Sequence, residues 1–355
     1  MDLGPQNVLG KRTSLVDPIV MEFVNRMERY MNDPEMEFEA RLGILTLPTS
    51  SKSATRLPLP IITETMLAPS GSCVAQNGRG FKYEFQAGLV DESVFKKVAG
   101  LMDILHSQKF DHNPPNPVFK VLNVSTSKTV DEVFRKPLQC RVRYDWSTYP
   151  PQFDTEPLEF IAKETLEKMD VWMGHCVDID DEGTAEEEGQ MRHPLDYRLA
   201  INREKKLDRS LLSSLNRADC TMRRDRVRVS YEMKAWVVDL TTVVEAGTGI
   251  TKYEVEAELK LDLLREQFAR RAAQKSNGVY QIVQDFLQFM RDLACMFGPD
   301  SSERISDKST IYPDLSVCGP DESLKRKYAK IISPDVFPII GDYVFKIIDE
   351  VAPPS

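Results

Sequence analysis

Two segments far apart in the chain alternate apolar residues with glutamates. Residues 36–42 read MEFEARL and residues 253–259 read YEVEAEL. Successive side chains of a β-strand point to opposite faces. The first segment therefore places Glu37 and Glu39 on one face, and the second does the same with Glu254, Glu256 and Glu258. We expect two strands, each with one apolar and one acidic face.

The acidic faces have two explanations. A strand at the surface commonly has one solvated polar face. Like charges stacked along a strand repel each other, however, and hard divalent cations bind clustered carboxylate oxygens. The pattern of either segment alone is consistent both with a solvated face and with a metal-binding site.

The remaining pattern predicts helices at both ends of a strand-rich region. Asp17-Pro18 is a typical helix start, and apolar residues then recur at helical spacing. Helices are predicted at 18–31, 91–108, 261–274 and 278–297. Strands are predicted at 36–42, 60–66, 80–88, 117–124, 126–134, 139–146, 158–170, 171–177, 195–206, 222–231, 234–244 and 251–260. Residues 46–80 read as a long loop around the 60–66 strand, and residues 178–190 as an acidic loop.

Charged residues occupy alternate positions on many of the predicted strands. Shared faces are expected for Arg141 with Arg143, for Arg198 with Asn202 and Glu204, for Arg224 with Arg226 and Arg228, and for Asp239 with Thr241, and Lys163 lies within the strand 158–170. So many antiparallel strands predict an α+β fold built on a sandwich or a closed barrel. If the charged faces converge, they line a polar tunnel, and the apolar faces pack outward against helices.

This combination of charges suits phosphate chemistry. The guanidinium fork matches phosphate oxygens, and carboxylates hold a metal ion that can bridge to them. Cleavage of a phosphoanhydride depends mainly on positioning and on neutralising the developing charge. A single strand of this kind is typical of a solvated face, so the hypothesis depends on the whole set.

Composition excludes several classes of protein. The 355 residues are 41% hydrophobic with a net charge of −9 and a pI near 5.2, which argues against general binding to duplex nucleic acid. The six cysteines form no CxxC pair and the four histidines no HxxxH pair, so a zinc site or disulfide framework is not expected. No signal peptide or membrane-length apolar run is present, which favours a reduced intracellular compartment without a membrane partner.

The motifs also resemble a known family. The strongest marks are EFEARLG at 37–43 and YEVEAEL at 253–259. Supporting marks are RLPLPIITETML (56–67), FQAGLVDESVF (85–95), SKTVDEVF (127–134), RVRYD (141–145), RLAINRE (198–204), RRDRV (223–227) and VDLTTV (238–243). In this order they resemble the fungal and protozoan metal-dependent RNA 5′-triphosphatases, the family of the triphosphatase subunit of mRNA capping enzyme. These belong to the triphosphate tunnel metalloenzymes, and the resemblance covers roughly residues 18–297.

The resemblance implies a fold and an activity. The expected fold is a closed eight-stranded antiparallel β-barrel, a hydrophilic triphosphate tunnel with helices packed on the outside. The expected domains are a flexible arm (1–16), a catalytic domain (17–297) and a C-terminal extension (298–355). The implied reaction removes the γ-phosphate from the 5′-triphosphate end of nascent mRNA, which leaves a 5′-diphosphate end. It is the first step of cap formation, uses Mg²⁺ or Mn²⁺, and takes place in the nucleus.

The resemblance also implies roles for individual residues. The metal set is Glu37, Glu39, Glu254, Glu256 and Glu258. The catalytic set is Glu204 and Glu258, which orient the attacking water, with Arg224 and Arg226. The phosphate-binding set is Arg141, Arg143, Lys163, Arg198, Arg224 and Arg226, and the supporting pair is Asp239 and Thr241. Arg224-x-Arg226 stands where the family usually has Lys-x-Arg, Arg228 offers a second register for this pair, and Met222 stands at a third, usually basic position.

Other functions stay open from the sequence alone. An inorganic tripolyphosphatase or nucleoside triphosphatase of the same superfamily would share the glutamate strands. From other classes, a non-catalytic module that binds polyphosphate or an RNA end, and an interaction scaffold without a site, remain alternatives. The chain has no KxDG motif, so an RNA guanylyltransferase would be a separate chain, for which the arm or the extension is a candidate docking segment. A homodimer is a further candidate assembly.

Overall fold

The structure, a computed structural model, describes most of the chain between residues 17 and 296. The described ranges are 17–47, 55–56, 73–75, 83–88, 92–107, 120–151, 155–173, 176–177, 191–192 and 195–296. The predicted arm (1–16), extension (298–355), acidic loop (178–190) and short strand (60–66) lie outside these residues. The predicted domain boundaries therefore stay predictions.

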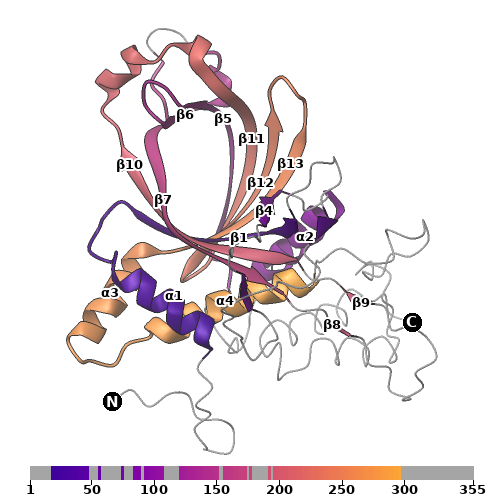
Figure 1. The fold of residues 1–355 in the computed structure, drawn as a ribbon, viewed down its shortest axis with the longest axis vertical. Helices are drawn as coiled ribbons and strands as arrows, with labels where there is room; N and C mark the ends of the chain where they lie inside the picture. The colour runs from indigo at the N-terminus through magenta and orange to yellow at the C-terminus, as the bar shows by residue number, and fades with distance from the viewer. Residues whose placement is uncertain are drawn as a thin grey trace, which may run out of the picture.

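Eight long antiparallel strands close into a barrel (Figure 1). They are β1 (Met36–Leu47), β5 (Asn123–Phe134), β6 (Cys140–Asp145), β7 (Glu159–Trp172), β10 (Asp196–Lys206), β11 (Cys220–Glu232), β12 (Trp236–Glu245) and β13 (Thr251–Leu259). Around the barrel their order is β10-β1-β13-β12-β11-β5-β6-β7, and pairing of β7 with β10 closes it. The predicted closed eight-stranded antiparallel barrel is confirmed.

Short strands extend the barrel wall at its edges. β2 (Thr55–Arg56) and β4 (Glu84–Ala87) pair with the end of β1, and β3 (Cys73–Ala75) pairs with β7. A separate two-stranded sheet contains β8 (Cys176–Val177) and β9 (Met191–Arg192). Of these, β4 matters most for the site, because it adds side chains to one end of the barrel interior.

Two pairs of predicted strands are wrong in their boundaries. The segments predicted at 117–124 and 126–134 contribute one strand, β5, and those at 158–170 and 171–177 contribute β7 and the separate β8. The polar run at 125–128 looks like a break in the apolar pattern, yet its backbone pairs with β11 from Ser125 to Lys128. Interstrand hydrogen bonds thus continue a strand where the alternation of its own side chains fails.

Apolar strand faces point away from the tunnel and pack against helices. These are α1 (Pro18–Glu28), α2 (Glu92–Ser107), α3 (Leu261–Ala272) and α4 (Val279–Met296). The Asp17 carboxylate caps α1 by accepting from the Ile19 amide at 2.8 Å, and Figure 1 shows α1, α3 and α4 beneath β1. No helix of the described residues is long and apolar enough to cross a membrane.

A second, smaller core lies outside the barrel. The connection from β10 to β11 carries two short 3-10 helices, Arg209–Ser214 and Arg217–Asp219. Three of its leucines, Leu207, Leu212 and Leu215, pack on the outward faces of β5, β6 and β7. The connection therefore acts as a strap across these three strands, because it must pass them to reach β11.

Trp236 joins the barrel to α4. Its side chain is fully buried, and its ring centroid lies 5.8 Å from that of Phe286 and 5.6 Å from that of Phe289. We expect Trp236→Ala to lower the free energy of unfolding by about 3–5 kcal/mol, because it removes a large buried side chain and leaves a cavity. Urea denaturation measures this, with the exposed Ile250→Ala as control at about 0.5 kcal/mol or less. Equal effects of the two substitutions would contradict this packing.

Candidate active site

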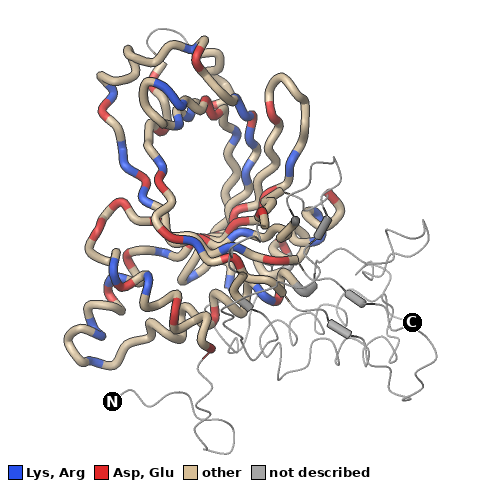
Figure 2. The backbone as a smooth tube through the Cα atoms, viewed as in Figure 1, with Lys and Arg blue, Asp and Glu red and all other residues tan. Residues whose placement is uncertain are grey.

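The two acidic strands lie side by side. β1 pairs with β13 in a register that places Glu39 opposite Glu258 and Arg41 opposite Glu256. Figure 2 shows acidic residues gathered where these strands run together, with basic residues on the neighbouring strands. Pairing of β1 with β13 thus joins two segments that lie more than 200 residues apart in the sequence.

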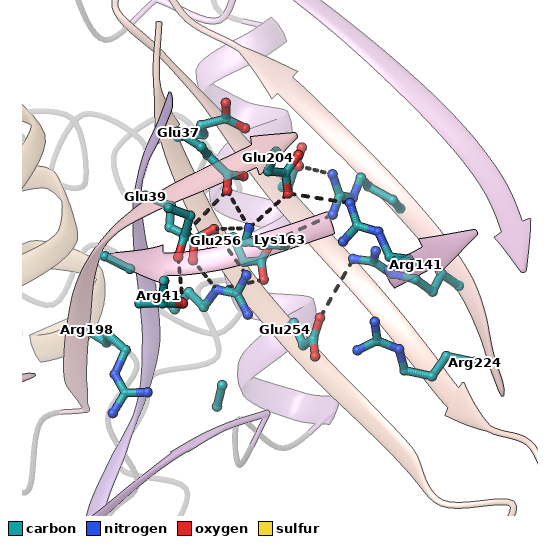
Figure 3. Close-up of a pocket in the computed structure, with 18 of the residues that line it drawn as sticks. Glu37, Glu39, Arg41, Arg141, Lys163, Arg198, Glu204, Arg224, Glu254 and Glu256 are labelled. Carbon is teal, nitrogen blue, oxygen red and sulfur yellow. Dashed lines mark hydrogen bonds and ion pairs between the residues drawn. The ribbon is translucent and has the colours of Figure 1, made fainter. Parts of the chain in front are cut away.

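The inward faces enclose a cavity of about 390 Å³ (Figure 3). That size suits a small ligand such as a triphosphate. The lining includes every predicted site residue except Thr241: Glu37, Glu39, Arg141, Arg143, Lys163, Arg198, Glu204, Arg224, Arg226, Asp239, Glu254, Glu256 and Glu258. Thr241 is fully buried and accepts a hydrogen bond from Arg228 Nε at 3.2 Å.

Two cations occupy the acidic side of the cavity. Lys163 contacts Glu37, and its Nζ lies 3.3 Å from Glu39 Oε2 and 3.1 Å from Glu204 Oε1. Arg41 Nε lies 3.0 Å from Glu39 Oε1 and 3.1 Å from Glu256 Oε1. These ion pairs offset the repulsion among the carboxylates, which explains how so many can share one face.

The same pairs determine which carboxylates ionise easily. Burial alone would raise the pKa of Glu256, but the guanidinium groups of Arg41 and Arg228 outweigh it and hold this pKa at about 2. Burial also opposes ionisation of Glu39, and Arg41 and Lys163 lower its pKa nonetheless. Glu39 and Glu256 are therefore firmly charged.

The pKa values of two other carboxyl groups are raised instead of lowered. Burial and the nearby Glu39 raise the pKa of Glu37 to about 7, although Lys163 opposes the shift. Desolvation by the tunnel wall, together with repulsion from the Glu37 and Asp239 carboxylates, raises the pKa of Glu258 to about 8. The Glu258 side chain is still exposed to solvent that enters the tunnel. This side of the cavity thus has a deficit of positive charge.

The facing wall is basic and is organised by one buried carboxylate. Asp131 Oδ1 lies 2.7 Å from Arg143 Nε, and Asp131 Oδ2 lies 3.1 Å from Arg226 Nη1 and 3.6 Å from Arg224 Nη2. Against the cost of burial, Arg143 and Arg226 lower the pKa of Asp131 to about 2. Arg143 Nη1 also lies 2.7 Å from Glu159 Oε2. One acid therefore holds three arginines from β6 and β11 together.

Several of these arginines have unused donors. The Nε atoms of Arg141, Arg224 and Arg226 are buried and have no hydrogen-bond partner. A buried donor without an acceptor costs free energy, and the guanidinium groups of all three line the cavity. The side chains of Arg141 and Arg224 also keep 18% and 24% of their surface exposed, and phosphate oxygens entering the cavity would bind there, because guanidinium and phosphate form strong charge-assisted hydrogen bonds.

The acidic wall fits a divalent cation by its donor chemistry. Within the described residues, no three His, Cys, Asp or Glu side chains are already gathered closely enough to hold a metal ion. The wall nevertheless supplies carboxylate oxygens, which hard cations prefer, and Asp239 Oδ1 is buried without a hydrogen-bond partner. A cation would compete with Arg41 and Lys163 for Glu37, Glu39 and Glu256.

The sequence reasoning missed several residues of the site. Arg41 shares the alternation of Glu37 and Glu39, so the pattern itself could have indicated it. Asp131 and Asp170 had no comparable signal, because their arginine partners lie on other strands. Phe85 reaches the cavity only through the pairing of β4 with the end of β1.

The raised pKa of Glu258 generates a prediction about stability. An acid with a pKa of about 8 when folded and about 4.5 when unfolded favours the folded state below pH 4.5, and this advantage is lost as pH rises to 8. We expect the Tm of the metal-free protein to fall over this range, and Glu258→Gln to reduce the fall by about 2–4 °C. Calorimetry measures this, with the exposed outer-face Glu164→Gln as control. An unchanged pH profile in Glu258→Gln would contradict the assigned environment.

Comparisons with known proteins agree with this geometry. Residues 192–296 match the family model described as mRNA capping enzyme, beta chain, while no curated protein sequence matches the chain. The structure of S. pombe Pct1 RNA triphosphatase is similar at a TM-score of 0.56 and 18% identity, over 81% of this chain and 96% of that chain. The same protein in complex with the Spt5 CTD is similar at 0.56 and 17%, over 81% and 97%.

A Mimivirus capping enzyme triphosphatase matches at a TM-score of 0.32 and 12% identity, over 74% of this chain and 95% of that chain. The likeness to the S. pombe structures establishes the shared fold, and the family model covers β10 to α4, which include the basic strand β11 and the acidic strand β13. Residues 192–296 thus match the mRNA capping enzyme beta chain family, and the described barrel shares the fold of the S. pombe RNA triphosphatase structures.

Proposed function

We propose that this protein hydrolyses the γ-phosphate from the 5′-triphosphate end of nascent mRNA and leaves a 5′-diphosphate end. The observation that carries the proposal is the pairing of two unlike walls in one cavity. Arginines with unused buried donors line one wall, and carboxylates with a deficit of positive charge line the other. A triphosphate together with a divalent cation would satisfy both walls.

The basic residues would bind and orient the triphosphate. Arg141, Arg143, Lys163, Arg224 and Arg226 surround the cavity, and Asp131 holds three of the arginines in fixed positions. Fixed donors stabilise charge that develops in the transition state without the cost of reorganisation. Lys163 on the acidic side is linked to the basic wall through Glu204, whose Oε1 lies 3.1 Å from Lys163 Nζ and 3.5 Å from Arg141 Nη2.

The acidic residues would hold the cation and the attacking water. The proposed ligands are Glu37, Glu39, Glu254, Glu256 and Glu258, with Mg²⁺ or Mn²⁺ as the ion. When bound, the ion would neutralise charge on the transferred phosphoryl group. Glu204 and Glu258 are the candidates to accept a proton from water and to orient it for in-line attack.

Two residues that support the site, Asp239 and Thr241, would position an arginine beside the acidic strand. Asp239 and Thr241 both contact Arg228, whose Nη2 also lies 3.6 Å from Glu256 Oε2. The role expected for Asp239 and Thr241 is therefore to fix Arg228 beside the acidic strand rather than to touch substrate.

The other functions predict different measurements. A tripolyphosphatase or nucleoside triphosphatase would use the same walls, so direct competition between triphosphate-ended RNA and tripolyphosphate separates these from the RNA enzyme. A binding module without catalysis has no use for a row of carboxylates beside an anion, so metal-dependent turnover excludes it.

The proposed setting is nuclear mRNA capping. A separate RNA guanylyltransferase would add the cap to the diphosphate end, and a homodimer is the proposed assembly. The similar S. pombe structure is a complex with the Spt5 CTD. Co-purification with a guanylyltransferase, and light scattering for the dimer, test these two proposals.

Loss of the metal or of a metal ligand should stop turnover. We expect phosphate release from triphosphate-ended RNA to require Mg²⁺ or Mn²⁺, and Glu37→Gln to reduce kcat/KM by about 100-fold or more, in line with the loss of one transition-state contact. Malachite-green phosphate assays measure this, and circular dichroism checks the fold. The control is Glu164→Gln on the outer face. Full activity in folded Glu37→Gln would overturn the assignment.

Loss of an arginine from the basic wall should slow the hydrolysis of every triphosphate substrate by a similar factor. Arg224 contacts only Asp131 among the ion pairs described, at 3.6 Å, so Arg224→Ala leaves that carboxylate with two closer arginine partners and should fold. We expect the kcat/KM for RNA and for tripolyphosphate to fall by a similar factor, about 10- to 100-fold. A neutral effect on both substrates would remove Arg224 from the phosphate site.

A further inference from the structure

One end of the cavity differs in chemistry from the rest. Apart from Phe85, Ala87 and Ala200, the described residues that line the cavity are charged or polar. Phe85 and Ala87 both come from β4, which pairs with the end of β1 beyond Arg41. The apolar surface therefore lies at the end of β1 that is remote from Glu37, where neither a phosphate nor a metal needs it.

Neighbouring residues hold the ring of Phe85 in a fixed position. A Cβ atom at Gly43 would lie 2.6 Å from the Phe85 ring and 2.6 Å from the Gln86 carbonyl oxygen, so the absence of a side chain at Gly43 gives the ring its place. Phe85 also packs against a small core of Leu45, Ala75 and Trp172. The ring is thus fixed on one side and borders the cavity on the other.

Arg198 lies over this ring and is neutralised by its own carboxylate. Its guanidinium carbon is 4.5 Å from the centre of the Phe85 ring. Asp170 accepts from both Nε and Nη2 of Arg198, the latter at 2.9 Å, and is 2% exposed. The Tyr83 hydroxyl donates to Asp170 at 3.1 Å. By contrast, Arg224 has only a share in Asp131, at 3.6 Å, because Arg143 and Arg226 lie closer to that carboxylate, so Arg198 has less uncompensated charge than Arg224 to offer a phosphate.

A compensated guanidinium stacked on an aromatic ring suits a different ligand. Nucleobases stack on aromatic rings and on guanidinium planes, and such contacts are largely independent of base identity. Arg198 lies opposite Arg41 in the pairing of β10 with β1, and Arg41 contacts both Glu39 and Glu256. The stacked pair is thus a direct neighbour of the carboxylates proposed to hold the metal.

We propose that Arg198, backed by Phe85 and held by Asp170, is the platform on which the first nucleobase of a triphosphate-ended substrate stacks. The proposal rests on the function proposed above. It attributes the preference of the protein for nucleotide triphosphates over inorganic polyphosphate to this platform. It replaces the phosphate-binding role that the sequence predicted for Arg198. Phe85 acts as a positioning residue, because it contacts the base only through Arg198.

The first test needs no substitution. We expect the KM of the full-length protein for ribose 5-triphosphate, which lacks a base, to be about tenfold higher than that for adenosine triphosphate, because one stacking contact is worth about that factor. The kcat values should agree within about twofold. Equal KM values for the two substrates would overturn the platform.

The second test separates stacking from general damage. Phe85→Leu keeps apolar volume but removes the aromatic face, and should raise the KM for triphosphate-ended RNA about five- to tenfold while leaving that for tripolyphosphate unchanged. Phe85→Tyr should restore the wild-type ratio, and Phe95→Leu on α2, outside the tunnel, is the matched control. An equal rise for both substrates in Phe85→Leu would show a merely structural role and overturn the proposal.

Failure of the two proposals can be told apart. If no triphosphate is hydrolysed with any divalent cation, the proposed function fails. The platform is then judged by binding alone, from the rise in Tm produced by adenosine triphosphate against that produced by ribose 5-triphosphate. A larger rise with adenosine triphosphate supports the platform, and equal rises overturn it.

Discussion

The pairing of carboxylates with cations across a closed barrel is the interaction on which the site depends. Glutamates on β1 and β13 would repel each other if the strands stood alone. Arg41 and Lys163 reach between them and hold Glu39 and Glu256 in their charged form. The compensation is incomplete, as the raised pKa values of Glu37 and Glu258 show. That deficit is what makes the acidic wall receptive to a cation.

Because the interior of the barrel is charged, the hydrophobic core lies outside the barrel rather than within it. In this barrel the apolar faces point outward, where α1, α3 and α4 cover one side and the strap from β10 to β11 covers another. Site and core therefore occupy alternate positions of the same strands. Val238 is fully buried outside the barrel while its neighbour Asp239 lines the cavity. A shift of one residue in strand register would exchange the two faces, so the packing of the core also fixes the position of the site.

The basic wall is not uniform. Asp131 gathers three arginines and leaves buried donors on Arg224 and Arg226 unused, which suits an incoming anion. Asp170 instead neutralises Arg198 alone, and the guanidinium rests on Phe85. Arginines that look equivalent in sequence thus differ in how much charge they can offer a ligand. The difference comes from the number of arginines that share each buried carboxylate.

The alternation of apolar and charged residues along the strands determined much of this protein by itself. Because side chains of a strand point to alternate faces, the sequence was enough to place Glu37 with Glu39, Arg141 with Arg143 and Arg224 with Arg226, and the ordered motifs indicated the closed barrel. Only the tertiary structure decided which charges meet. The grouping of three arginines on Asp131, the place of the Phe85 ring beside Gly43, its contact with Arg198, and the continuity of β5 and β7 all depend on pairing between strands. Those contacts arise from register and barrel closure, which the residues of a single strand do not specify.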